Sequence, residues 1–387
     1  MKYDFTNPPA RAGTDCYQYD LFPGLFPMWV ADMDFQTAPE IVSALNKRVE
    51  HGIYGYAMIP DSWAKAYQDF YGDEYGWKIE KEELVYSLGV VPILSSSVRA
   101  LTSVGDNVVI MPPVYNIFYN SILNNKRNVY EVPLIDKDGR YFMDFGALES
   151  AFSKAETTLC IFCNPGNPTA RIWSKEEINE LAALGRKYNV IVLSDEIHGL
   201  LTRPGKKYQP FLTADEKNVE GAFAAISPTK AFNLAGLHTA AMVCADEKIR
   251  KKVERQLNTD EVAEPNIFSC IASTTAFNEG REWLKQCREV LFDNRDYATA
   301  YIRKNIKGLV PYEGDATYLL WVDHTAVEPD TDKLLKYLQD NQKLLFNNGI
   351  TYGKGGEGHL RINLACPRAK LEEGLRRLKE GIASYSK

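Results

Sequence analysis

The sequence contains no long apolar run and no block of basic residues. No window approaches the roughly 20 apolar residues that a membrane helix requires, and no charged start followed by an apolar stretch marks a signal peptide. The 51 acidic and 45 basic side chains are spread along the chain, and the net charge is -6, so no positive stripe is available for a phosphate backbone. We therefore expect a cytoplasmic protein that binds neither membranes nor nucleic acid.

Cysteines are few, and their spacing does not indicate a disulfide framework. There are seven, an odd number, and most stand within apolar runs, which is typical of buried reduced thiols rather than of disulfides. Cys160 and Cys163 form a C-x-x-C, but they lie inside the strand-like run TLCIFC with no second pair or nearby histidine. The sequence therefore predicts no metal site.

The length of 387 residues and the hydrophobic content of 45% suit a large domain with a smaller partner. Short β-rich runs alternate with segments of helical period, which predicts an α/β fold with a mainly parallel sheet covered by helices. These runs occupy 106–111, 158–163, 190–196, 222–227 and 238–244. From about residue 280, amphipathic helices surround two further strand-like runs. We predict an amino-terminal arm (1–45) that belongs to the small domain, a large domain (46–279) and a carboxy-terminal small domain (280–387).

One helix has clear boundaries in the sequence. Ser174 caps it and Glu177 closes a capping box, and apolar residues recur on one stripe from Ile178 to Tyr188. This helix is expected to pack against the sheet.

Candidate chemistry concentrates where strand runs end, because ligands of open parallel sheets bind outside the carboxyl ends of the strands. A turn at Gly89, Val90 and Val91 precedes a helix and offers free amides to a phosphate. The turn-rich segment 164–171 offers the amide of Asn167, with an ordinary loop as the alternative.

Two further places of this kind follow. Asp195, Glu196 and His198 follow an apolar strand, where an acid is costly unless a cation meets it. Ser227 and Lys230 follow the next strand in SPTKAFNLAGL, where a lysine that simply reaches water is the alternative.

These sites together suit a ligand with a phosphate, a hydroxyl, a basic ring nitrogen and an aldehyde, and pyridoxal phosphate has all four. Four motifs carry a resemblance to a known family: MWVADMDF (28–35), SDEIHGLL (194–201), SPTKAFNLAGL (227–237) and HLRINLACPR (359–368). Through them the chain resembles the fold-type I pyridoxal-phosphate-dependent enzymes of the aminotransferase class I and II superfamily. Within it, the chain is similar to the cystathionine β-lyase group of MalY and PatB. The resemblance implies a large domain with a mainly parallel seven-stranded sheet flanked by helices, and a smaller α+β domain.

The resemblance also implies a role for each candidate residue around the cofactor. Lys230 would bind pyridoxal 5'-phosphate covalently and then act as a base, and Asp195 would pair with the ring nitrogen. Asn167 and His198 would lie near the ring oxygen, and Tyr115 would stack on the ring. The cofactor phosphate would be bound by the amides of Gly89, Val90 and Val91 and by the hydroxyl of Ser227.

Tyr56 would reach the phosphate of a neighbouring subunit, which implies a homodimer with shared active sites. Tyr54 competes for that role, and Tyr56 and Lys230 are both candidates for protonating a departing thiolate. Arg361 would hold the substrate carboxylate, with a structural salt bridge as its alternative. Ala31 and Asp32 would line the substrate pocket.

The resemblance favours a carbon–sulfur β-lyase. The expected reaction cleaves L-cystathionine or a related cysteine S-conjugate to a thiol, pyruvate and ammonia. The first alternative is an aminotransferase for aromatic or other neutral amino acids, because the same residues serve both reactions. A regulatory protein-binding role is the third interpretation, although no segment of the chain marks a surface for it.

Overall fold

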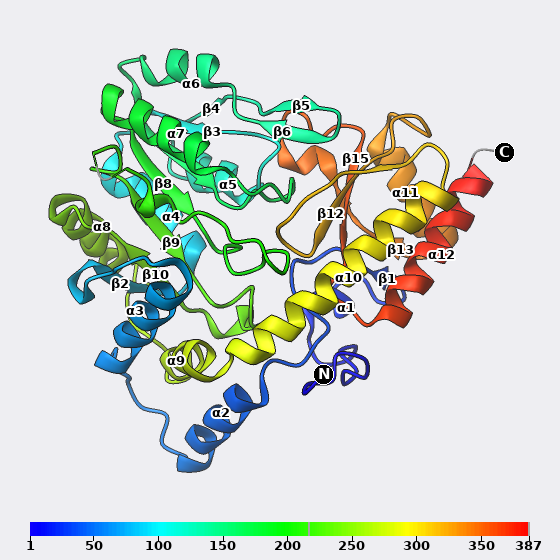
Figure 1. Ribbon diagram of the computed structural model, residues 1–387, viewed down its shortest axis with the longest axis horizontal. Helices are drawn as coiled ribbons and strands as arrows, with labels where there is room; N and C mark the ends of the chain where they lie inside the picture. Colours follow the sequence, from blue (N-terminus) through cyan, green and yellow to red (C-terminus); the bar gives the residue numbers. More distant parts are fainter. Residues whose placement is uncertain (216, 386–387) are drawn as a thin grey trace.

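A seven-stranded sheet forms the centre of the larger part of the molecule (Figure 1). The computed structural model describes residues 1–215 and 217–385. The strands are β2 (Leu84–Ser87), β3 (Asn107–Ile110), β4 (Asn128–Glu131), β7 (Thr157–Cys163), β8 (Ile191–Asp195), β9 (Phe223–Ile226) and β10 (Ala240–Val243). Their order is β2-β10-β9-β8-β7-β3-β4, with β10 antiparallel to both neighbours and every other pair parallel. The mainly parallel sheet is confirmed, and all five predicted strand runs lie in it.

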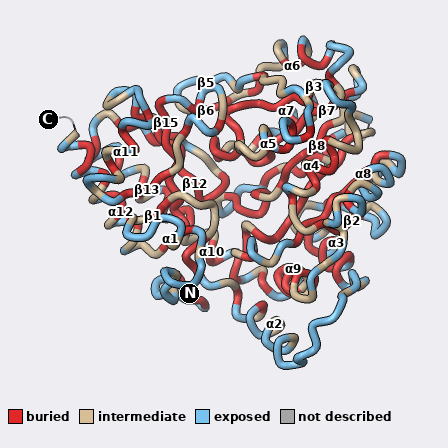
Figure 2. The backbone as a smooth tube through the Cα atoms, turned by 180° about the vertical axis from the view of Figure 1, so that it is seen from behind, coloured by how far each residue is buried: buried red, intermediate tan, exposed pale blue. Residues whose placement is uncertain are grey.

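Helices bury both faces of this sheet, which explains why its strands read as continuous apolar runs. Alternate residues of a strand point to opposite faces, so Val108 and Ile110 join one apolar cluster while Val109 joins another. The first cluster includes α4 (Val90–Leu101), α5 (Ile117–Leu123) and α8 (Glu247–Thr259). The second includes α6 (Phe145–Phe152) and α7 (Lys175–Tyr188). Figure 2 shows this buried interior in red.

The predicted capped helix is α7. The Ser174 hydroxyl accepts from the Glu177 amide at 3.2 Å, and the Glu177 carboxylate accepts from the Ser174 amide at 2.7 Å. The helix ends where Asn189 takes up a left-handed conformation with φ of 56°. Its buried stripe faces the second apolar cluster, as the periodicity predicts.

Three helices pack beside the β2 edge of the sheet: α2 (Pro39–His51), α3 (Asp61–Tyr75) and α9 (Ser269–Glu279). Their core is aromatic, with Trp63 and Tyr67 of α3 among its buried members. The segment 52–60 between α2 and α3 is largely exposed and extends away from the sheet (Figure 2). It therefore carries Tyr54 and Tyr56 out to the surface.

The carboxy-terminal part begins with α10 (Arg281–Asn305), a helix of 25 residues. It has a four-stranded antiparallel sheet in the order β11 (Val310–Pro311), β12 (Leu319–Asp323), β15 (His359–Asn363) and β14 (Asn347–Asn348). Helices α11 (Thr331–Gln342) and α12 (Arg368–Tyr385) pack with α10 on this sheet. The change of pattern near residue 280 and the smaller α+β region are therefore confirmed. The domain boundaries themselves stay predictions.

The amino-terminal segment joins this carboxy-terminal part. It contains α1 (Tyr17–Asp20) and β1 (Phe26–Pro27), and β1 pairs in parallel with β13 (Leu344–Leu345). The short remaining elements are β5 (Ile135–Lys137), β6 (Arg140–Phe142), η1 (Lys81–Glu83), η2 (Phe211–Thr213), η3 (Ala235–Leu237) and η4 (Gly349–Tyr352). Within the described residues, every helix is too short or too polar to cross a membrane.

Candidate active site

Lys230 lies in the loop between β9 and β10, and its amine is turned into the protein. Its Nζ donates to the carbonyl of Ala31 at 2.7 Å, and the hydroxyl of Tyr318 donates to the same oxygen at 2.9 Å. Burial and the charge of Arg361 lower the pKa of Lys230 to about 8, against the opposing charges of Asp32 and Asp195. An amine with this pKa is available as a nucleophile or a base near neutral pH.

Two adjacent acids lie at the end of strand β8, Asp195 as its last residue and Glu196 directly after it, and their surroundings differ. Asp195 is buried and accepts one hydrogen bond, from the Ile197 amide at 3.1 Å. Glu196 is equally buried but accepts from the hydroxyls of Ser194 and Tyr208 and from the amide of Phe211. Burial raises the pKa of each acid to about 7. Asp195 therefore has the capacity to take a further charged partner, whereas Glu196 has its donors already.

His198 is buried beside the site and keeps an open ring nitrogen. Burial first, and then the charges of Lys230 and Arg361, lower its pKa to about 3. Its ring meets that of Tyr318 edge-on, with 6.4 Å between the centroids. No group in the described part of the chain bonds to its Nδ1. His198 is therefore a neutral side chain that could hydrogen-bond a ligand oxygen.

Arg361 of β15 is buried and held by acceptors from three segments. Its Nη1 donates to Oδ1 of Asn167 at 3.0 Å, and its Nη2 donates to the Trp29 carbonyl at 2.9 Å and to Oδ1 of Asn347 at 2.8 Å. Its Nε is buried without an acceptor, and no acid among the described residues pairs with it. The fork is therefore fixed in orientation, with one donor open, and the salt-bridge alternative is not what the structure contains.

The amino terminus of α4 is a potential anion site. Gly89 is its cap residue, no side chain caps it, and the first amides of a helix have no acceptor within the helix. Ser227 is buried and already engaged, since its hydroxyl donates to the Thr239 carbonyl at 2.7 Å and contacts the Thr229 hydroxyl at 2.8 Å. Sequence reasoning missed Thr229, although it stands inside the motif that carries Lys230.

Tyr115 is half-buried and lies within the electrostatic reach of the site. Burial raises its pKa, Arg361 opposes that change, and Asp195 adds to it. The structure thus brings Lys230, Asp195 and Arg361 into one electrostatic environment with Tyr115.

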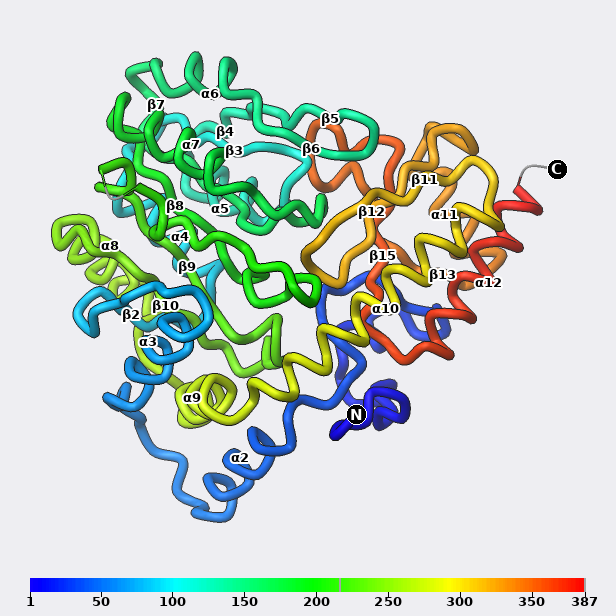
Figure 3. The backbone as a smooth tube through the Cα atoms, in the orientation of Figure 1, coloured from blue at the N-terminus to red at the C-terminus, as the bar shows by residue number. Residues whose placement is uncertain are grey.

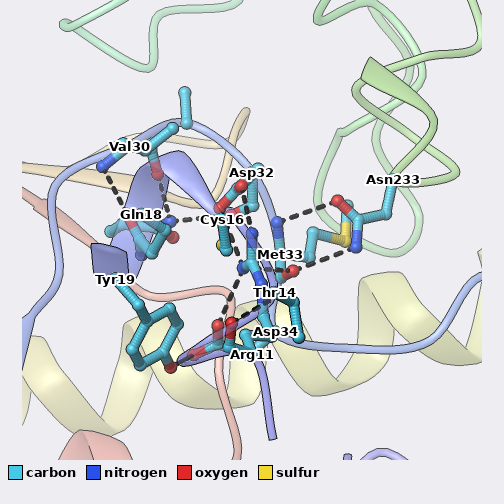
Figure 4. Close-up of polar contacts among 12 residues, drawn as sticks. Arg11, Thr14, Cys16, Gln18, Tyr19, Val30, Asp32, Met33, Asp34 and Asn233 are labelled. Carbon is cyan, nitrogen blue, oxygen red and sulfur yellow. Dashed lines mark hydrogen bonds and ion pairs between the residues drawn. The ribbon is translucent and has the colours of Figure 1, made fainter. Parts of the chain in front are cut away.

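The segment that carries Ala31 and Asp32 is pinned on two sides (Figure 4). Arg11 donates to the carboxylates of Asp32 and Asp34. Asn233 bonds to both the amide and the carbonyl of Met33, at 3.0 and 2.9 Å. The carbonyl that receives the Lys230 amine is therefore held in place by the amino-terminal arm and by the lysine's own loop. No sequence pattern indicates Arg11. Tyr318 lies in the segment ATYLLWVD (316–323), and Asn233 follows Lys230 by three residues in the quoted motif.

Tyr56 is the predicted site residue that does not join the others within one chain. Its side chain is fully exposed, and Tyr54 donates instead to the Val49 carbonyl at 2.8 Å. Residues 54–57, 236–237 and 265–268 line an open cavity of about 620 Å³ beside it. A role for Tyr56 in the site therefore requires a second copy of the chain.

The model of the family described as aminotransferase class I and II matches residues 28–378. The chain belongs to this family. The resemblance noted from the motifs is therefore confirmed, and with it the fold type.

Three relatives illustrate the similarity within the aminotransferase class I and II family. Cystathionine beta-lyase PatB of Bacillus subtilis is 35% identical, over 98% of this chain and 100% of that protein. The structure of cystalysin from Treponema denticola, which contains a pyridoxal 5'-phosphate cofactor, is 29% identical with a TM-score of 0.96, over 99% of this chain and 100% of that one. The pyridoxal-phosphate-bound C-S lyase from Staphylococcus hominis is 29% identical with a TM-score of 0.91, over 99% and 98%.

Proposed function

We propose that this chain is a pyridoxal-phosphate-dependent carbon–sulfur β-lyase. It cleaves L-cystathionine or a related cysteine S-conjugate to a thiol, pyruvate and ammonia. The observation that carries the proposal is the half-buried Lys230, whose amine donates to the Ala31 carbonyl and has a lowered pKa in the fields of Asp195 and Arg361. The full-length similarity to a cystathionine β-lyase and to a C–S lyase supports this choice of reaction.

The residues present fit pyridoxal phosphate. Asp195 is a buried carboxyl with one hydrogen bond, which suits a cationic ring nitrogen. His198 keeps an open nitrogen for the ring oxygen, and the uncapped amino terminus of α4 at Gly89, Val90 and Val91 suits a phosphate. When bound, the cofactor supplies an aldehyde for the lysine and a ring that accepts the electron pair left at the substrate Cα.

Lys230 has two tasks, and its lowered pKa suits both. It would hold the cofactor through its amine, and it would serve as the base that takes the Cα proton of a bound amino acid. The Ala31 carbonyl, which receives Nζ at 2.7 Å, holds the freed amine. Asp195 would pair with the ring nitrogen and keep it protonated, because a buried carboxylate favours a cationic partner.

Arg361 orients the substrate. Its guanidinium meets the α-carboxylate with the open Nε, while Asn167, Trp29 and Asn347 fix the plane of the fork. Orientation of this kind aligns the Cα–H bond with the base, which is a large part of the rate enhancement in such sites.

The active unit is a homodimer with shared active sites. The exposed segment that carries Tyr54 and Tyr56 borders an open cavity, and a partner chain seated there would bring Tyr56 to its phosphate. Mixing Lys230→Ala subunits with Tyr56→Phe subunits tests this. Mixed dimers hold one site with neither change, so activity above that of both parents is expected, whereas activity no higher than either parent contradicts sharing.

The protein acts in the cytoplasm. All seven of its cysteines are free, and six are buried, which suits a reducing compartment. Fractionation of the source cells, with the activity followed in each fraction, tests this assignment.

The decisive experiment incubates the holoenzyme with L-cystathionine and no keto-acid acceptor. Equal release of pyruvate and free thiol is expected from β-elimination. If no product is released until a keto acid and an amino donor are supplied, the reaction is transamination, which the family description also covers. In that case the site residues stand and the reaction is that of an aminotransferase for aromatic or other neutral amino acids.

A further inference from the structure

A second large cavity lies away from Lys230, between the two parts of the molecule. It has a volume of about 1100 Å³ and is lined by the β5–β6 hairpin, the loop at 170–175, the loop at 203–209, α10 and the segment 310–315. Figure 3 shows these elements around the junction, with α10 in yellow. None of the residues assigned to the active site lines it.

The lining of this cavity is strongly basic, although the chain as a whole has a net charge of -6. Nine lysines and arginines line it against four aspartates and glutamates. Ion pairs neutralise part of this charge, because Arg203 pairs with Asp296 and Asp315 while Arg303 pairs with Glu313. The cations that form no ion pair with any described residue are Lys137, Arg140, Lys175, Lys206 and Arg295.

Arg295 is the unusual member of this group, because it is only 3% exposed. Its Nη2 donates to the carbonyl of Leu319 at 2.6 Å, but its Nε and Nη1 find no acceptor in the described part of the chain. Burial lowers its pKa to about 10, and Arg203 adds to that effect. A buried guanidinium with two open donors is costly, and a nearby anion would reduce that cost.

A second like-charge pair borders the same cavity. The field of Arg140 acts with burial to lower the pKa of Arg171, against the opposing charge of Glu177. Arg140 belongs to the β5–β6 hairpin side and Arg295 to α10, so unneutralised charge faces the cavity from both parts of the molecule.

We propose that this cavity, here called the basic cleft, binds a small polyvalent anion that carries two or more phosphate or carboxylate groups. The anion lies over Arg295 and contacts Arg140, Lys175 and Lys206 at the rim. It bridges the two parts of the molecule and so stabilises their mutual arrangement.

The basic cleft is connected to the active site by one short loop. The Arg171 carbonyl accepts from the Gly166 amide at 2.9 Å, and the Ala170 carbonyl accepts from the Ala316 amide at 3.2 Å. Asn167, which bonds to Arg361, lies inside this loop. The basic cleft and the active site therefore share the loop 166–171.

Isothermal titration of the holoenzyme with inorganic tripolyphosphate, and separately with citrate, tests the proposal without using activity. We expect a Kd below about 1 mM for at least one of them at low ionic strength, weakening as salt is added. Stronger binding of tripolyphosphate assigns the phosphate class, and stronger binding of citrate assigns the carboxylate class. Absence of binding by both overturns the proposal.

Charge reversal at the rim locates the site. The double variant Arg140→Glu with Lys206→Glu is expected to weaken binding at least about tenfold, since each removes a charge-assisted contact. Lys285→Glu, an exposed position on α10 outside the cleft, is the matched control. Unchanged binding in the double variant, or loss of binding in Arg361→Ala instead, would place the anion elsewhere and overturn the proposal. The substitutions are placed at the rim and not at Arg295, because Arg295 also donates to backbone carbonyls and its loss would disturb the fold.

Discussion

Arg361 and Arg295 are two buried arginines of the carboxy-terminal part, each 3% exposed, and they serve different surroundings. Arg361 is held by a carbonyl and two side-chain amides that come from three distant segments, and its buried Nε has no acceptor among the described residues. Arg295 is held by carbonyls of the single segment 316–319 and keeps two open nitrogens beneath the basic cleft. Open donors on a desolvated cation mark places where an anion belongs.

Arg361 and Arg295 differ in the groups that hold their guanidinium in place. A guanidinium fixed from several elements keeps one plane, as is needed to align a substrate for reaction. A guanidinium fixed by one backbone segment attracts an anion through its charge but orients it less strictly. The following substitutions test the roles of the residues around Arg361.

The largest effect is expected at Lys230. Lys230→Ala should lower turnover of L-cystathionine by at least about 1000-fold, because both the covalent attachment and the base are lost. The visible absorption band of the bound cofactor should disappear with it. Lys285→Ala is the control for a lysine removed elsewhere. A retained band in Lys230→Ala would contradict the assignment.

A smaller loss is expected at Arg361. Arg361→Lys keeps a positive charge but loses the planar fork, so kcat/KM should fall by about 100-fold. The loss should be found mainly in KM, and steady-state kinetics with varied L-cystathionine measures the split. Arg255→Lys on the surface of α8 is the matched control. An unchanged KM would mean that Arg361 has only the structural contacts described above.

The adjacent acids Asp195 and Glu196, at the end of β8, sharpen the same contrast. Asp195→Asn should lower kcat by about 100-fold, since a neutral amide no longer favours a protonated ring nitrogen. Glu196→Gln should act on stability instead, lowering the free energy of unfolding by about 2 kcal/mol, because an amide group then faces donors. Urea unfolding and kinetics on both variants check this, and a reversed pattern would exchange their roles.

The same acids predict a pH dependence for the protein without cofactor. Their folded pKa of about 7 lies above the ordinary values of 3.8 and 4.5, so the folded state retains protons that the unfolded state has released. The stabilising contribution is complete below about pH 4 and is lost as the pH rises through about 7. Urea unfolding should show the free energy of unfolding falling by several kcal/mol across that window, since a shift of one pKa unit corresponds to about 1.4 kcal/mol. Asp195→Asn should flatten the profile, and an identical slope in that variant would contradict the assignment.

The smallest effect is expected at Tyr318. Tyr318→Phe removes the hydroxyl that donates to the Ala31 carbonyl, while Lys230 keeps its own bond to that oxygen. A neutral hydrogen bond is worth about 1 kcal/mol, so kcat should fall by less than about tenfold. A loss as large as that of Lys230→Ala would show that Tyr318 takes part in the reaction itself.

Much of the fold was predictable because its elements are defined locally. The capping box at Ser174 and Glu177 specifies where α7 begins, and the β-branched run at 190–196 contains β8. The site residues that follow these strands were also predictable, since the carboxyl ends of parallel strands meet at one edge. Asp195 and Lys230 are of this kind.

The contacts among those residues were not predictable, because they join segments far apart in the chain. No local sequence pattern indicates that Arg11 forms an ion pair with Asp32. Nor does one indicate that Tyr318 and Lys230 both donate to the Ala31 carbonyl. Tyr56 illustrates the limit most clearly, since its predicted position depends on a second copy of the chain.

The sequence by itself determined the α/β fold, the family and the candidate site residues, because periodicity, caps and motifs act over short distances. Only the tertiary structure decided which donors stay open. Arg361 and Arg295 are both plain arginines in the sequence. Packing alone distinguishes Arg361, which is bonded to Asn167, from Arg295, which lines the basic cleft, because burial and acceptor geometry depend on contacts between distant segments.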